Sequence, residues 1–150
     1  MKNRRGFTLV EIMIVVAIIA LLAAIAIPNL LRARSNANEA AAVAGLKTIV
    51  SAAISFRSVN NAYPGVLTSL AAPNATPPYI DSVLGCTTGD GCPKSGYSFS
   101  LLGSANTFTA TATPLVYQTT GNRSFMVNES GVIYFTTTNT VPTTASSALE

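Results

Sequence analysis

The residue with the most unusual chemistry is Glu11, a carboxylate within the otherwise uncharged run from Phe7 to Leu31. A charged side chain in a membrane-like segment costs roughly 2.5–3.5 kcal/mol near the bilayer centre, so such residues usually have a function. The sequence contains two cysteines, Cys86 and Cys92, and no histidine. These counts exclude a conventional zinc site and the histidine-dependent catalytic arrangements of serine and cysteine enzymes. We therefore expect no catalytic residue, no metal site and no cofactor.

The charge distribution argues against a nucleic-acid-binding surface. Charged residues make up 10% of the 150 residues, whereas about 25% is usual in a soluble domain. Nine side chains are basic and six are acidic, and three of the basic ones lie in the first five positions. The remaining charges balance, so no basic patch is left for phosphate contacts. We expect no specific nucleic-acid partner.

A segment near the N-terminus is apolar enough to cross a membrane. Residues 12–27 are all apolar, and about 20 such residues span a bilayer core as a helix. The span therefore covers about residues 7–28. Residues 1–6 form a short cationic leader, which predicts a cytoplasmic N-terminus. Arg32 and Arg34 follow the span and reduce this asymmetry.

A conventional secretory signal peptide is the first alternative for this segment. Ala24-Ile25-Ala26 would supply the small-residue exit that signal peptidases recognise. The carboxylate of Glu11 and the helical sequence beyond the run favour retention of the segment instead. A plain membrane anchor is the second alternative, and it leaves the charge at Glu11 unexplained.

The helical pattern continues beyond the apolar run as an amphipathic stripe. Apolar residues recur there at spacings of three and four, which is one face of a helix: Val43, Leu46, Ile49, Val50, Ala53 and Phe56. Asn60, Asn61 and Pro64 then provide a stop signal. We predict one helix over residues 7–58, with a transmembrane half and an amphipathic half.

The rest of the chain, residues 59–150, is predicted to form a small β-rich head. After a loop-like region, four runs rich in β-branched and aromatic residues read as strands: Tyr97–Leu102, Thr107–Thr113, Ser124–Val127 and Val132–Thr137. Residues 128–131 form a short hairpin connection, and the Ser/Thr-rich tail to Ser147 is expected to be mobile. The predicted fold class is α+β, with the amphipathic helix packed on a small antiparallel sheet.

The leader and the start of the run closely resemble a known processing signal. Gly6-Phe7-Thr8-Leu9-Val10-Glu11 is similar to the signal of type IV prepilins and type II secretion pseudopilins. This resemblance implies a pilin-like fold, cleavage after Gly6 by a prepilin peptidase, and methylation of the new N-terminal Phe7. It also implies an assembly role for Phe7 and Glu11, and a helix kink at Pro28.

Cleavage at this position has a physical rationale as well. Glycine leaves the backbone unobstructed for a peptidase, and the cut removes the leader while keeping the apolar helix. The freed amino group of Phe7 is a cation near Glu11, so the carboxylate of one subunit could pair with an adjacent subunit. Pro28 lacks an N–H, which predicts local loosening of the helix.

A head exported across the cytoplasmic membrane meets oxidising conditions. We therefore expect a disulfide between Cys86 and Cys92, which enclose five residues. A redox-catalytic pair needs closer spacing and thiolate activation, and the sequence offers neither.

The leading hypothesis is a structural subunit of a type IV pilus-like filament. The resemblance implies a single-pass protein of the inner membrane that is polymerised by assembly machinery into an extracellular or periplasmic homo-oligomer, for motility, adhesion or DNA uptake. A pseudopilin of type II secretion is the alternative. It is disfavoured because the acid-rich calcium loop usual near the C-terminus of major pseudopilins is replaced by a threonine-rich stretch. A membrane-anchored enzyme or binding module is the third hypothesis, and no convergent polar residues support it.

Overall fold

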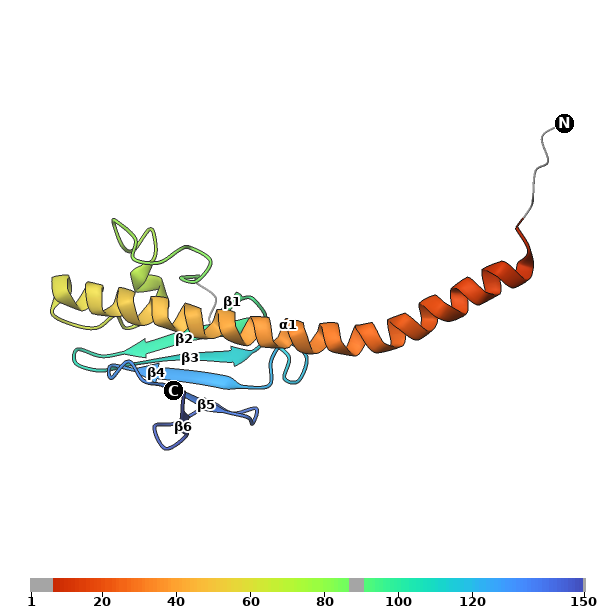
Figure 1. Ribbon diagram of the computed structural model, residues 1–150. Helices are drawn as coiled ribbons and strands as arrows, with labels where there is room; N and C mark the ends of the chain where they lie inside the picture. The colour runs from red at the N-terminus through yellow and green to blue at the C-terminus, as the bar shows by residue number, and fades with distance from the viewer. Residues whose placement is uncertain (1–6, 87–90, 150) are drawn as a thin grey trace. The chain divides into compact units, whose positions relative to one another are not determined.

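Helix α1 runs without interruption from Leu9 to Asn60 in the computed structural model, which describes residues 7–86 and 91–149 (Figure 1). The chain separates into two compact units, residues 1–34 and residues 35–150, and α1 contributes to both. The helix ends beside Asn61, which adopts a φ of 55°, in the left-handed region that asparagine tolerates at a helix C-terminus. The predicted long helix is confirmed.

The first unit, as far as it is described, is the N-terminal part of α1 alone. Every large apolar side chain from Phe7 to Leu31 is exposed, with exposed fractions between 48% and 81%. This helix is long and apolar enough to cross a membrane. An apolar surface of this extent requires cover by lipid or by other apolar helices.

The second unit contains a six-stranded antiparallel sheet in which each strand pairs with its neighbour in sequence, in the order β1-β2-β3-β4-β5-β6 (Figure 1). The strands are β1 (Cys92–Lys94), β2 (Tyr97–Gly103), β3 (Phe108–Pro114), β4 (Ser124–Asn128), β5 (Ile133–Thr136) and β6 (Ser147–Ala148). A 3-10 helix, η1 (Leu67–Leu70), lies in the long connection between α1 and β1. The expected α+β architecture, a helix on an antiparallel sheet, is confirmed.

The two edge strands are absent from the sequence prediction. Strand β1 joins β2 through Ser95 and Gly96, whose φ values of 50° and 76° fit the two-residue hairpin turns that follow the twist of the sheet. Strand β6 begins at Ser147, the last residue of the tail that was expected to be mobile, and it pairs with β5. The mobility of the remaining tail stays a prediction.

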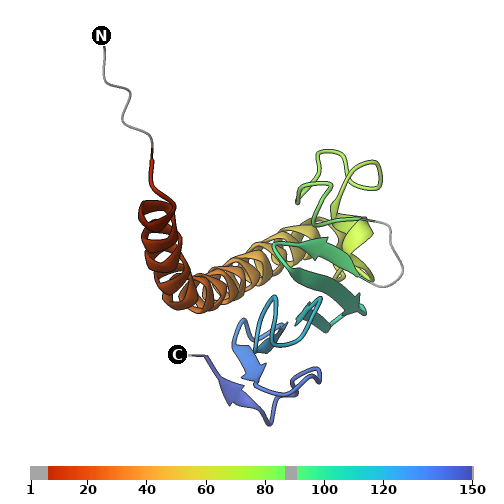
Figure 2. The same cartoon turned by 90° about the vertical axis from the view of Figure 1, so that its right-hand side faces the viewer.

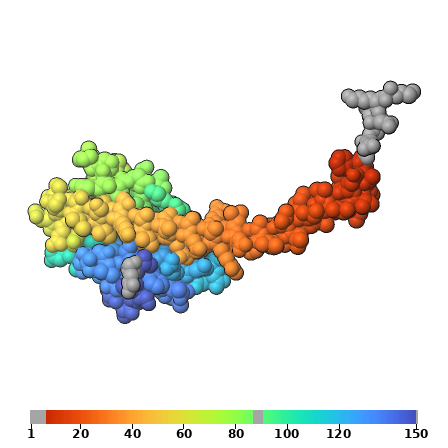
Figure 3. Space-filling model, viewed as in Figure 1, coloured from red at the N-terminus to blue at the C-terminus, as the bar shows by residue number. Residues whose placement is uncertain are grey.

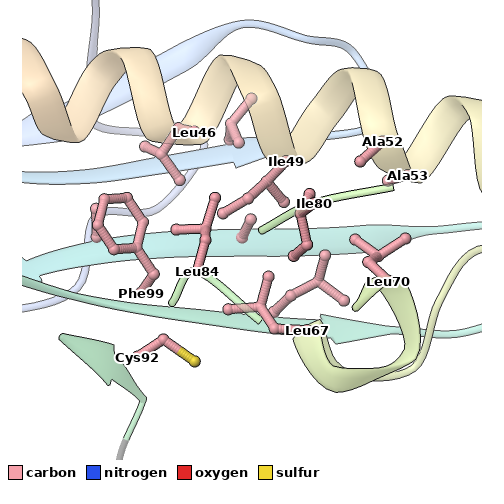
Figure 4. Packing of buried hydrophobic residues seen from close by; sticks show 14 of the residues in the cluster. Leu46, Ile49, Ala52, Ala53, Leu67, Leu70, Ile80, Leu84, Cys92 and Phe99 are labelled. Atoms are coloured by element: carbon pink, nitrogen blue, oxygen red, sulfur yellow. The ribbon is translucent and has the colours of Figure 1, made fainter. Parts of the chain in front are cut away.

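The core lies between the second half of α1 and one face of the sheet (Figure 4). In β2 the inward residues Tyr97, Phe99 and Leu101 alternate with more exposed ones, as a sheet with one covered face requires. Leu46 and Ile49 of α1 are fully buried in the same cluster. The predicted amphipathic stripe is thus confirmed, and it also extends toward the N-terminus, to Ala42, Glu39 and Ser35.

Gly45 explains how the helix approaches the sheet so closely. A Cβ atom at this position would lie 2.8 Å from two ring atoms of Phe99. Phe99 is 1% exposed, so the ring has little room to move. Glycine is unfavourable within a helix by up to about 1 kcal/mol relative to alanine, and here close packing offsets that cost.

Other segments lie on either side of α1 within the second unit. The connection formed by residues 61–86 lies along one side of the helix, and strands β4 to β6 lie toward the other (Figures 2 and 3). The order of the sheet agrees, because β1 follows that connection at one edge and β6 forms the opposite edge. The two sides of the head therefore present different surfaces.

Candidate functional site

The N-terminus of α1 is capped by reciprocal hydrogen bonds between Thr8 and Glu11. The backbone N–H of Thr8 donates to Glu11 Oε2 at 2.8 Å, and the Thr8 hydroxyl donates to the same oxygen at 2.7 Å. The N–H of Glu11 approaches Thr8 Oγ1 at 3.2 Å. This arrangement is a capping box, which satisfies backbone groups that the first turn of a helix leaves without partners. Glu11 therefore has a role within its own chain.

One carboxylate oxygen of Glu11 takes no part in this cap. Oε2 accepts both hydrogen bonds from Thr8, whereas Oε1 accepts none from the residues that the structure describes. Phe7 immediately precedes the cap and its side chain is 81% exposed. Gly6 and the leader lie outside the described residues. The cap thus holds the carboxylate in place with one oxygen available to a cation from outside the helix.

Pro28 lies within α1, which continues through it. Because proline has no N–H, the carbonyl of Ala24 lacks its usual partner four residues later. The helix does not break at this point, and the expected kink stays a prediction.

A buried carboxylate, Glu39, joins α1 to the loop between β3 and β4. Its side chain is 5% exposed, and its Oε2 pairs with Nε of Arg123 at 2.7 Å. Its Oε1 accepts the backbone N–H of Asn122 at 2.9 Å. At the preceding position of the helix, the amide nitrogen of Asn38 donates to the carbonyl of Thr120 at 2.9 Å. These contacts fix the 115–123 loop to the helix.

Tyr97 supports the same loop from the sheet. The phenol is fully buried, and it donates a hydrogen bond of 2.7 Å to the carbonyl of Arg123. Burial, followed by the negative charge of Glu39, raises the pKa of the phenol well above its ordinary value of 10.0. Gly121 lies against the ring, and any Cβ there would overlap the Tyr97 hydroxyl.

The two cysteines are bonded, as expected. Cys86 and Cys92 form a disulfide with their Cα atoms 5.4 Å apart. An ion pair of 2.8 Å between Lys94 and Asp81 lies just outside this covalent loop. The hydrogen bond from Lys94 lowers the pKa of the Asp81 carboxyl, which also accepts the N–H of Leu84. Residues 87–90 within the loop lie outside the described residues.

Within residues 7–86 and 91–149 there is no group of three or more metal-ligating side chains that could hold an ion. The cysteines are used in the disulfide, and Glu39 and Asp81 are each paired with a cation. The polar clusters that the structure describes are therefore structural clamps in the head and a helix cap at the N-terminus.

The Thr8 cap and the pairing of Glu39 are among the features that the sequence did not lead us to predict. The Thr8 cap could have been found from its Thr-x-x-Glu spacing, which is the signature of a capping box. The pairing of Glu39 with Arg123 had no comparable signal, since 84 positions separate the two residues.

The comparisons with known proteins agree with the processing signal. Residues 1–27 match the family model described as the prokaryotic N-terminal methylation motif. Over 122 residues the chain is 37% identical to the type IV wide pilus major component PilA4 of Thermus thermophilus, covering 79% of this chain and 90% of the relative. The chain belongs to the type IV pilin family.

Two further relatives match shorter parts of the chain. The type IV major pilin protein PilA of Myxococcus xanthus is 49% identical over 61 residues, which is 41% of this pilin but 28% of the relative. The type II secretion system core protein G of Klebsiella pneumoniae is 35% identical over 81 residues, covering 51% of this pilin and 58% of the relative. PilA4 thus matches more of the chain than the secretion protein does, and the pseudopilin alternative is not favoured. These relatives are named as structural components rather than enzymes.

Proposed function

We propose that this chain is the subunit of a type IV pilus-like filament, polymerised through the first half of α1. Before assembly it is held in the inner membrane by about residues 7–28, with the leader (1–6) in the cytoplasm and the head, residues 59–150, outside. A prepilin peptidase cleaves between Gly6 and Phe7, and the new N-terminus is methylated. Family membership and the apolar helix support this proposal.

The observation that carries the proposal is the exposed apolar surface of the first unit. Its large apolar side chains are exposed from Phe7 to Leu31, and Glu11 is the single charge among them. Lipid covers such a surface in the membrane, and neighbouring apolar helices cover it in a filament. A cleaved signal peptide would remove this surface, whereas cleavage after Gly6 keeps all of it.

Glu11 would select one axial position of a neighbouring subunit, which apolar packing alone does not specify. Its Oε1 is free of hydrogen bonds from the described residues, and cleavage creates a cationic amine at Phe7 of each subunit. In a water-excluding bundle an unpaired carboxylate is costly, so a neighbour is stabilised only where its amine reaches Glu11. The kink proposed at Pro28 would let neighbouring rods adjust while these ends stay paired.

Because Glu11 also caps the helix, two substitutions are needed to separate its charge from its capping role. Glu11→Gln keeps an oxygen that can accept the hydrogen bonds from Thr8 but removes the charge. Glu11→Val removes both. If pairing with an amine drives assembly, both variants are inserted and cleaved normally, and both are depleted from filaments. The measurement is the ratio of variant subunit in sheared filaments to that in the membrane fraction.

Two outcomes separate pairing from capping. Wild-type incorporation of Glu11→Gln, with loss for Glu11→Val, would show that Glu11 acts only through the helix cap and would refute the pairing. Wild-type incorporation of both would remove Glu11 from assembly altogether. Co-expression with wild type should partly rescue Glu11→Gln, because the variant still offers its amine to the Glu11 of a neighbour.

A further inference from the structure

The second unit, which comprises the head and the part of α1 packed on it, contains two charged side chains that form no ion pair with another described residue. Within residues 35–86 and 91–149, the other charged groups are already engaged: Glu39 with Arg123, Asp81 with Lys94, and Arg57 with the hydroxyl and ring of Tyr63. Lys47 and Glu129 are both exposed, and neither forms an ion pair with a described residue. They are opposite in sign.

Lys47 lies at a polar groove along the exposed face of α1. The groove has a volume of about 400 Å³ and is lined by hydroxyl-bearing and small residues together with Lys47: Thr48, Ser51, Ala52, Ser55 and Tyr79. A second hollow of about 240 Å³ shares Thr48 and continues along the helix to Ala41, bordered by Lys94 of β1. The cation is therefore at a concave, polar surface on the β1 side of the head.

Glu129 lies in the tight connection between β4 and β5. Asn128 Oδ1 accepts the backbone N–H of Ser130 at 3.1 Å and its hydroxyl at 2.5 Å. Gly131 supplies the positive φ of 76° that closes the turn. The acidic side chain is thus carried on a short, internally bonded projection, whose shape suits entry into a groove.

These two surfaces lie on different sides of the same head. The segment that holds Tyr79 lies along one side of α1, and strands β4 and β5 lie toward the other (Figures 2 and 3). In the sheet, β2 and β3 separate β1 from β4. A contact between different patches of identical chains is heterologous, and repeated contacts of this kind build open helical polymers rather than closed dimers.

We propose that the Lys47 groove of one subunit receives the Glu129 turn of a second copy of this chain. This inference rests on the proposed filament and adds a specific contact between heads. The paired charges would favour one orientation of neighbouring heads, because other orientations leave Lys47 and Glu129 without this attraction.

Charge exchange tests the pairing. Lys47→Glu and Glu129→Lys should each lower the filament-to-membrane ratio of the pilin by about threefold or more, since repulsion replaces attraction. The doubly exchanged chain, Lys47→Glu with Glu129→Lys, should recover most of the loss. Wild-type ratios for both single variants, or a double variant no better than the singles, would overturn the pairing.

Cross-linking gives the geometry directly. A chain carrying both Lys47→Cys and Glu129→Cys should form a ladder of covalent oligomers when sheared filaments are oxidised. Chains that carry one substitution each, expressed together, should stop at dimers, and either chain alone should stay monomeric. Filaments without any ladder would refute this contact while leaving the filament itself intact. Absence of filaments from the wild-type chain would instead refute the proposed function and this contact with it.

Discussion

Replacing Glu39 with alanine tests whether the buried clamp holds the head together. The carboxylate accepts two hydrogen bonds, from Arg123 Nε at 2.7 Å and from the Asn122 N–H at 2.9 Å. Hydrogen bonds to charged groups contribute about 1.5–3 kcal/mol each. Arg123 keeps 39% of its side chain exposed, so water can replace part of what is lost. We therefore expect Glu39→Ala to lower the free energy of unfolding by about 2–4 kcal/mol.

The exposed ion pair of the same head is a matched control. Asp81 and Lys94 are 2.8 Å apart, but their side chains are 50% and 40% exposed. Such surface pairs contribute about 0–1 kcal/mol, so Asp81→Ala should change stability little. Because the pKa of Asp81 is lowered in the fold, this small contribution is present at neutral pH and is lost as the pH falls below its ordinary value of 3.8.

Thermal unfolding of the full-length chain in detergent or nanodiscs measures both effects. The sequence has no tryptophan and five tyrosines, so near-ultraviolet circular dichroism reports tyrosine packing. A loss of 2–4 kcal/mol corresponds to a decrease of roughly 10 °C in Tm. Glu39→Gln should lie between wild type and Glu39→Ala, because it can still accept the Asn122 N–H. Equal Tm values for Glu39→Ala and Asp81→Ala would refute the reasoning from burial.

Two further predictions concern packing and alkaline pH. Gly45→Ala should lower the Tm although alanine favours helix, because the new Cβ would lie 2.8 Å from the buried Phe99 ring; an unchanged or higher Tm would show that the ring can move. The raised pKa of Tyr97 means that the unfolded chain loses its phenol proton first as pH rises. Stability should therefore fall above pH 10 by up to about 1.4 kcal/mol per pH unit. In Tyr97→Phe this pH-dependent component should be absent, and an alkaline transition identical to wild type would contradict the assignment.

The elements with a strong local pattern were predictable from the sequence. A continuous apolar run, followed by apolar residues at spacings of three and four, predicted the helix. Asn60 and Asn61 predicted its end. The four central strands contain β-branched and aromatic residues, and in β2 and β3 the alternation of the sequence matches the buried face. Strands β1 and β6 are three and two residues long, which is too short for a periodicity to be recognised.

The N-terminal motif was predictable in part. The polar contacts that join α1 to the 115–123 loop were not. Phe7 and Glu11 were identified from their order after a cationic leader, but the partnership of Glu11 with Thr8 was overlooked. No sequence pattern marks Glu39 as buried and paired, because only the fold brings Arg123 to it. Likewise, only the structure shows that Lys47 and Glu129 form no ion pair with a described residue, because it shows which charged side chains the others pair with.

The central claim is that this chain is cleaved after Gly6 and polymerises with its apolar helix intact. Intact-mass analysis of the subunit in sheared and purified filaments tests this claim most directly. The account predicts filaments made of this chain, with a mass corresponding to residues 7–150 plus one methyl group on Phe7. A filament subunit that retains residues 1–6, or one that begins after Ala26, would contradict it.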